Sequence, residues 1–198
     1  MHKNRVEAFS DGVLAIVITI MVLELKVPHG DSFSTLLPLW PVFLSYLLSF
    51  IYVAIYWNNH HHLFQAVKQV DGPILWANMH LLFWLSLLPF VSAWAGENHF
   101  TALPVALYGV VLLMAAIAYF ILSKCLIRHP GQKNILGEAL GNDHKGKISI
   151  GLYALGIGVA FFSPIFSGVL YIAVAIMWLV PDKRIERTLI SSSASNGK

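Results

Sequence analysis

Charged residues are scarce in this chain of 198 residues, at 12% of the sequence. A soluble domain carries about 25% charged residues. Hydrophobic residues make up 57% of the chain, and its mean hydropathy is +0.69. These values exclude an ordinary soluble domain and predict an integral membrane protein, whose length leaves little room for a soluble domain beside several spans.

Several signatures are also missing from the sequence. The single cysteine, Cys125, excludes an intramolecular disulfide. The sequence has no glycine-rich phosphate loop and no T-V-G-Y-G selectivity filter, and it lacks the internal repeat typical of many secondary transporters. The net charge is +3. In a membrane protein such an excess usually comes from lysine and arginine in cytoplasmic loops and does not indicate nucleic-acid binding. We therefore expect no enzyme activity, no cofactor, no resident metal and no nucleic-acid partner.

Apolar runs long enough to cross a bilayer, about 20 residues each, follow one another along the chain. Four of them cover residues 6–25, 36–57, 74–95 and 103–123. The remaining run, 148–180, is too long for one span, and Ser163-Pro164 near its middle predicts a turn between two short helices. The sequence thus predicts an all-α integral membrane fold with six transmembrane helices in one domain, 1–190, and a disordered tail, 191–198.

The distribution of lysine and arginine indicates an orientation. With six spans both termini share one side of the membrane, and that side holds every lysine and arginine except Lys26. Cytoplasmic loops carry an excess of these residues. We therefore predict that both termini are cytoplasmic.

The first apolar run contains a carboxylate, Asp11, near its start. Such a group is costly in a membrane unless it has a partner, which makes it a candidate for a functional site. A helical projection places an apolar stripe on one face and Glu7, Ser10 and Asp11 on the other. The stripe contains Arg5, Phe9, Gly12, Ile16, Thr19, Ile20 and Leu23.

Glu7 and Asp11 lie four residues apart and carry like charges, so they need hydrogen-bond donors from other helices. The candidates are Asn78 and His80 on the third span and Trp57 and His60 at the end of the second.

Four residues at the start of the first helix form an R-x-x-x-F-S-D sequence: Arg5, Phe9, Ser10 and Asp11. This pattern resembles the signature of the transmembrane protein 175 family of potassium channels. The resemblance extends to residues 57–64, to Asn78 and to Leu88-Pro89, and it weakens after about residue 95.

The resemblance implies a homotetramer in a bacterial plasma membrane, with K⁺ as the permeant ion and the four first helices around a central pore. Ile16 matches the family's apolar constriction, and Thr19, Ile20 and Leu23 match further pore positions. The family also implies a polar network that positions each pore helix, made by Arg5, Phe9, Ser10, Asp11, Trp57, His60, Asn78 and His80. The expected partners are other copies of the chain, membrane lipids and monovalent cations.

Other interpretations stay open at this point. Without the resemblance, Ile16 and its apolar neighbours would more often be core or lipid-facing residues, and Thr19 would more often bond its own i−4 carbonyl. A proton-coupled small-solute transporter could use Asp11 and His80 as a relay.

Two further patterns need a structure to interpret them. A metalloenzyme could use the run His60-His61-His62, although adjacent helical residues point about 100° apart and cannot converge on one ion. The small residues Ala154 and Gly158, four apart, predict a close contact between helices.

Overall fold

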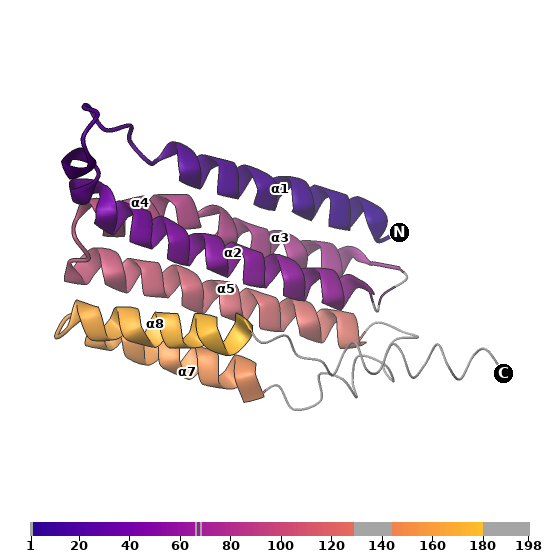
Figure 1. The fold of residues 1–198 in the computed structure, drawn as a ribbon. Coiled ribbons are helices and arrows are strands. Elements are labelled where there is room, and N and C mark those ends of the chain that lie inside the picture. The colour runs from indigo at the N-terminus through magenta and orange to yellow at the C-terminus, as the bar shows by residue number, and fades with distance from the viewer. Residues whose placement is uncertain (1, 66, 68, 129–143, 180–198) are drawn as a thin grey trace.

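The computed structural model describes residues 2–65, 67, 69–128 and 144–179, which form a bundle of α-helices (Figure 1). Two short 3-10 turns, η1 (Phe33–Thr35) and η2 (Leu37–Leu39), precede the second helix. The predicted tail at 191–198 lies outside the described residues. The helices are α1 (Asn4–Leu23), α2 (Trp40–Gln65), α3 (Gly72–Ser86), α4 (Leu88–Glu97), α5 (Ala102–Arg128), α7 (His144–Val159) and α8 (Pro164–Leu179).

Within the described residues, four helical stretches are long and apolar enough to cross a membrane: 4–23, 33–65, 72–97 and 102–128. Lipid offers no hydrogen-bond partner to the backbone N–H and C=O groups. An apolar segment in the membrane therefore pairs these groups with one another by forming a helix. These stretches confirm the first four predicted spans. The last pair is shorter, since α7 and α8 have 16 residues each. Such a helix rises about 24 Å, against a hydrocarbon core of about 30 Å.

The helix boundaries follow the helix-breaking residues. Helix α2 continues to Gln65, past the predicted end at Trp57, because the polar residues after Trp57 include no glycine or proline. The third span breaks at Leu87, between α3 and α4, because the ring of Pro89 does not fit the interior of a continuous helix. The predicted turn at Ser163-Pro164 is confirmed, since α7 ends at Val159 and α8 begins at Pro164.

The bundle has α1 at one edge and the α7–α8 pair at the opposite edge, with α2, α3, α4 and α5 between them (Figure 1). Helix α1 packs against α2, α3 and α4. The start of α1, the end of α2 and the start of α3 lie at the same end of the bundle (Figure 1). This arrangement leaves one side of α1 facing away from the rest of the subunit.

Tyrosine hydroxyls join α7 and α8 to the middle of the bundle. The buried Tyr52 on α2 donates to the backbone oxygen of Tyr171 on α8 at 2.6 Å. It accepts a hydrogen bond from the hydroxyl of Tyr153 on α7 at 3.3 Å. These interior polar groups are thus paired, as membrane-embedded polar groups must be.

Close helix approach occurs at glycines other than the one predicted. An ideal Cβ on Gly158 would meet nothing within 4 Å, and Ala154 is exposed as well, so the predicted close contact at this pair is wrong within the subunit. Helix α7 makes its close contact two residues earlier, where a Cβ on Gly156 would lie 2.5 Å from the Tyr171 ring. The α2–α4 contact is also tight, with 2.6 Å between a Cβ on Gly96 and the Val42 Cα.

Candidate functional site

Helix α1 has one face inside the subunit and one face outside it. Its buried residues recur every three or four positions, which is the spacing of one helical face. They are Val6, Ser10, Leu14, Val17 and Met21. On the other face, Ile16 is 60% exposed and Leu23 75% exposed, and Thr19 and Ile20 are exposed as well. The structure therefore leaves the four predicted pore residues uncovered by the described part of the chain.

Thr19 is the polar member of this exposed face. Its hydroxyl donates to the backbone oxygen of Ala15 at 2.8 Å, as expected for a helical threonine. Since the hydroxyl hydrogen points back along the helix, the oxygen lone pairs are free to accept from water or to coordinate a cation beside α1.

A chain of buried hydrogen bonds connects α1, α2 and α3. The Asn78 side-chain nitrogen donates to the Ser10 hydroxyl oxygen at 3.0 Å, and that hydroxyl donates to the Val6 backbone oxygen at 2.8 Å. The Asn78 side-chain oxygen lies 2.8 Å from Nε2 of His60. Because the amide nitrogen is directed at Ser10, the oxygen accepts and the His60 Nε2 carries the proton. All three side chains are buried.

Asp11 has a different environment from Ser10. Trp57 on α2 donates from its indole nitrogen to the Asp11 carboxylate at 3.0 Å, and both residues are exposed. Trp57, one of the predicted donors, is thus the partner of Asp11. Asp11 does not share the buried face of Ser10, because 100° of rotation from Ser10 carries it to the flank of the helix. Trp57 also stacks on His61, with ring centroids 6.2 Å apart.

Three other predicted network residues lie apart from these contacts. His80 accepts a hydrogen bond from the Trp84 indole, one turn along its own helix, at 2.9 Å. Arg5 and Phe9 are exposed on α1, on the same side as Ile16. Asp11 and His80 thus have separate partners, and no contact between them supports the relay of the transporter hypothesis.

The first two of the three consecutive histidines have different hydrogen-bond partners, since adjacent helical residues point in different directions. His60 is directed at Asn78. His61 shares a hydrogen bond with Gln65 at 2.8 Å. Within the described residues, no group of three histidine, cysteine, aspartate or glutamate side chains is arranged to hold a metal ion.

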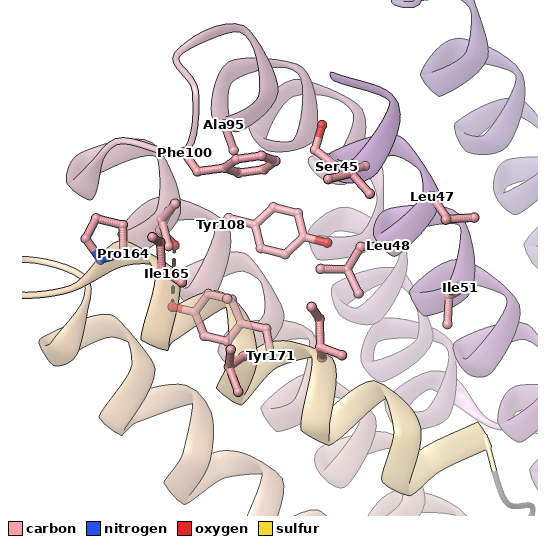
Figure 2. Close-up of a pocket in the computed structure, with 15 residues that line it drawn as sticks. Ser45, Leu47, Leu48, Ile51, Ala95, Phe100, Tyr108, Pro164, Ile165 and Tyr171 are labelled. Carbon is pink, nitrogen blue, oxygen red and sulfur yellow. Dashed lines mark hydrogen bonds between the residues drawn. The ribbon is translucent and has the colours of Figure 1, made fainter. Parts of the chain in front are cut away.

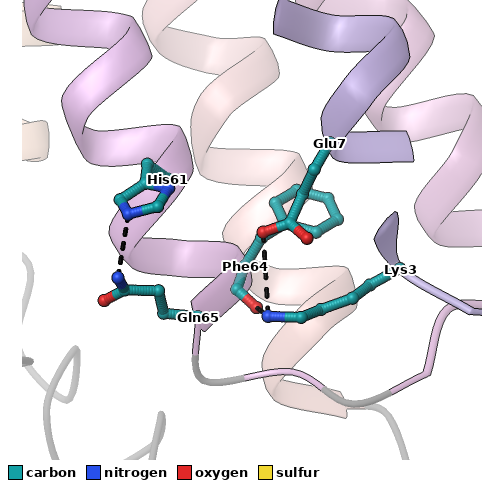
Figure 3. A network of polar contacts seen from close by, with 5 residues as sticks. All are labelled: Lys3, Glu7, His61, Phe64 and Gln65. Carbon is teal, nitrogen blue, oxygen red and sulfur yellow. Dashed lines mark hydrogen bonds and ion pairs between the residues drawn. The ribbon is translucent and has the colours of Figure 1, made fainter. Parts of the chain in front are cut away.

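Lys3, just before α1, joins the start of this helix to the end of α2 (Figure 3). The ammonium of Lys3 donates to the backbone oxygen of Phe64 at 2.8 Å and lies 3.7 Å from the Glu7 carboxylate. Phe64 lies in the last turn of α2, where unpaired carbonyls give the helix end a partial negative charge. Residue His2 also forms an isolated antiparallel bridge with Gln69. No sequence motif predicts these contacts, because they depend on which helix end lies beside the N-terminus.

An ion pair holds the opposite end of α1. Lys26, just after the helix, donates to the carboxylate of Glu97 at the end of α4. The hydrogen bond and the charge of Glu97 raise the pKa of Lys26. Contacts near both ends and in the first half of α1 therefore join this helix to the rest of the bundle.

The sequence and the fold both match known channels. The family model described as endosomal/lysosomal potassium channel TMEM175 matches residues 5–89. A potassium channel of Chryseobacterium sp. (strain P1-3) is 59% identical over 189 residues, which cover 96% of this chain and 98% of that protein. The chain belongs to the TMEM175 family.

A solved TMEM175 structure supports the fold across most of the chain. The crystal structure of a lysosomal potassium-selective channel TMEM175 homolog from Chamaesiphon minutus matches with a TM-score of 0.78 and 30% identity. The match covers 91% of this chain and 97% of that one. The endosomal/lysosomal proton channel TMEM175 of Gallus gallus is 30% identical over 145 residues, which are 65% of this chain and 29% of that protein.

TMEM175 proteins are ion channels, so the chain is a membrane channel protein and not an enzyme. The metalloenzyme hypothesis is therefore wrong. The region matched by the TMEM175 model contains the R-x-x-x-F-S-D sequence and all the predicted pore and network residues.

Proposed function

We propose that this TMEM175 protein forms a homotetrameric, K⁺-permeable channel in a bacterial plasma membrane, with six transmembrane helices in each subunit. Four copies of α1 would line the pore. The observation that carries this proposal is the uncovered face of α1, which presents Ile16, Thr19, Ile20 and Leu23 away from the subunit.

The composition of this face suits a pore with an apolar gate. In a conduit, the Thr19 oxygen lone pairs could replace part of an ion's hydration shell. Four Ile16 side chains around an axis would form an apolar ring that closes by excluding water. The match of these positions to the pore residues of the family supports the same assignment.

The polar contacts of α1 would hold each pore helix to its own subunit. The Lys3 bond to Phe64 fixes the start of α1, and the Ser10–Asn78 bond fixes its first half. The exposed Lys26–Glu97 pair adds a weaker contact near the far end. A pore lined by four helices keeps its radius only if each helix keeps its rotation and depth, which these contacts constrain.

The charge distribution supports six spans with both termini in the cytoplasm. Among the described residues, lysine and arginine gather near the start of α1, the end of α5 and the start of α7, which lie at one end of the bundle (Figure 1). Lys26 lies beyond the far end of α1. The positive-inside rule assigns the lysine-rich end to the cytoplasm. Two short helices, α7 and α8, would complete the six spans.

The permeant ion needs its own test, because the relatives have different names. The bacterial relatives are named potassium channels, whereas the Gallus gallus relative is named a proton channel. Proton conduction is therefore the second candidate. Reversal potentials under separate K⁺ and pH gradients distinguish the two, because only the permeant ion moves the reversal potential.

The pore assignment is tested by recording purified protein in planar bilayers. The variant Ile16→Asn replaces the apolar ring with a polar one and should raise conductance and relax the preference for K⁺ over Na⁺. The matched control is Ile176→Asn on α8, since Ile176 is 59% exposed and Ile16 60% exposed. The control should leave both quantities unchanged. Unchanged currents in Ile16→Asn would show that Ile16 does not line the pore.

A further inference from the structure

A cavity of about 480 Å³ lies between α2, α5 and α8 (Figure 2). Its inner wall includes Leu48, Tyr108 and Tyr171, and Phe100 closes the end beside Ala95 (Figure 2). Pockets of about 300–1,000 Å³ are large enough to hold small organic ligands. The cavity is therefore large enough for a molecule and not only for a water.

The polar atoms around this cavity already have partners inside the subunit. The Tyr108 hydroxyl shares a hydrogen bond with Ser49 at 3.0 Å. The Tyr171 hydroxyl donates to the Val105 backbone oxygen at 3.4 Å. The Ser45 hydroxyl donates to a backbone oxygen of its own helix, and the other lining side chains are apolar. The wall thus offers contact to hydrocarbon and no recognition for a polar ligand.

The cavity opens sideways, between α2 and α8. Its edges are exposed apolar residues, with Leu47 on α2 and Ile165, Val169 and Ile172 on α8. Helix α2 belongs to a stretch long and apolar enough to cross a membrane, and the edge residues of both helices are apolar. The medium at the opening is therefore lipid hydrocarbon rather than water.

We propose that this cavity binds one acyl chain of a membrane phospholipid. An unfilled apolar void forfeits dispersion contacts along its whole lining, and a hydrocarbon chain from the adjacent leaflet restores them without burying a polar group. The headgroup would stay outside the cavity, since the lining has no charged residue. The inference concerns lipid binding and does not depend on the ion that the channel conducts.

The chain's own C-terminal segment is a poor occupant. The described chain ends at Leu179, whereas the α8 residues of the cavity lie between Pro164 and Ile172. Residues 180–198 include Asp182, Lys183 and Arg184. Drawing these charges back along α8 into an uncharged cavity at membrane depth is unfavourable.

The test is photo-crosslinking in lipid nanodiscs that contain phosphatidylcholine with a diazirine in the middle of one acyl chain. Peptide mass spectrometry then locates the labelled residues. Tyr108 is 4% exposed, so lipid outside the subunit does not reach it and a chain inside the cavity does. We expect label on Tyr108, together with label on the exposed Ile176 as an internal standard. Label on Ile176 with none on Tyr108 would overturn the proposal, whether the cavity is empty or a neighbouring subunit fills it.

A cavity-filling variant gives a second arm. An ideal Cβ on Gly168, in the cavity wall, meets nothing within 4 Å, so Gly168→Leu projects its side chain into the open space. We expect this variant to lose the Tyr108 label and to keep the Ile176 label. Gly158→Leu is the matched control on the outer surface of α7, and it should keep both labels. Persistent Tyr108 label in Gly168→Leu would contradict the proposal, and the wild-type result stands even if that variant does not fold.

Discussion

Replacing Asn78 by leucine should loosen the pore helix from its subunit. The leucine side chain has a similar volume and cannot hydrogen-bond, so Asn78→Leu deletes the bonds to Ser10 on α1 and to His60 on α2. Ser10 keeps its own bond to the backbone of α1. His60 is 3% exposed, so water does not replace its lost partner.

The size of the effect follows from these contacts. Interhelical hydrogen bonds in membrane proteins contribute about 0.6 kcal/mol on average, so the two bonds together contribute about 1.2 kcal/mol. Leaving the buried His60 nitrogen unpaired costs roughly 1–3 kcal/mol. Part of this cost is already counted in the loss of the hydrogen bond to Asn78. We therefore expect the free energy of unfolding to fall by about 1–3 kcal/mol.

The assay is reversible unfolding of the purified protein in mixed micelles of detergent and SDS, combined with single-channel recording. Asn59→Leu is the matched control, because within the described part of the chain the Asn59 side chain donates to the Ile55 backbone oxygen of its own helix and to no other helix. It should lower stability by well under 1 kcal/mol, in the range of a single local bond. The double variant with Ser10→Ala should show coupling of about 0.6 kcal/mol between α1 and α3.

An Asn78→Leu variant as stable as wild type, with the same open probability, would refute this reasoning. A coupling free energy of zero between Ser10→Ala and Asn78→Leu would show that the Ser10–Asn78 hydrogen bond does not stabilise the packing of α1 against α3. If Asn59→Leu and Asn78→Leu lowered stability equally, the loss could not be assigned to the interhelical hydrogen bonds of Asn78.

Two further predictions concern other contacts of the bundle. Gly96→Ala should destabilise the protein by about 1–3 kcal/mol in the same unfolding assay, because the new Cβ would lie 2.6 Å from the backbone of Val42, which cannot move aside like a flexible side chain. Gly151→Ala, where a Cβ meets nothing within 4 Å, should be neutral or stabilising, and equal effects at the two glycines would contradict the packing account. Trp57→Phe removes the bond to Asp11 and should change single-channel open probability while altering stability by less than roughly 1 kcal/mol, since the contact is exposed. An unchanged open probability in Trp57→Phe would show that the Trp57–Asp11 bond does not affect gating.

Much of the site could be predicted because its signals are local. The stripe of Ile16, Thr19, Ile20 and Leu23 follows from the helical repeat alone, and the structure leaves that face uncovered. Asn78 and Trp57 were among the predicted donors for α1. Trp57 donates to Asp11, one of the two predicted acceptors, whereas Asn78 donates to Ser10, which was not among them. A sequence shows which polar groups need partners but not which ones meet.

The sequence by itself determined the apolar lengths, the breaks at proline and the two faces of α1, because each depends only on neighbours within a few residues. Only the tertiary structure decided that Lys3 caps the end of α2 and that α7 makes its close contact at Gly156 rather than Gly158. It also decided that a cavity opens between α2 and α8. These features depend on the relative rotation and depth of helices far apart in the chain, and many side chains together set that geometry.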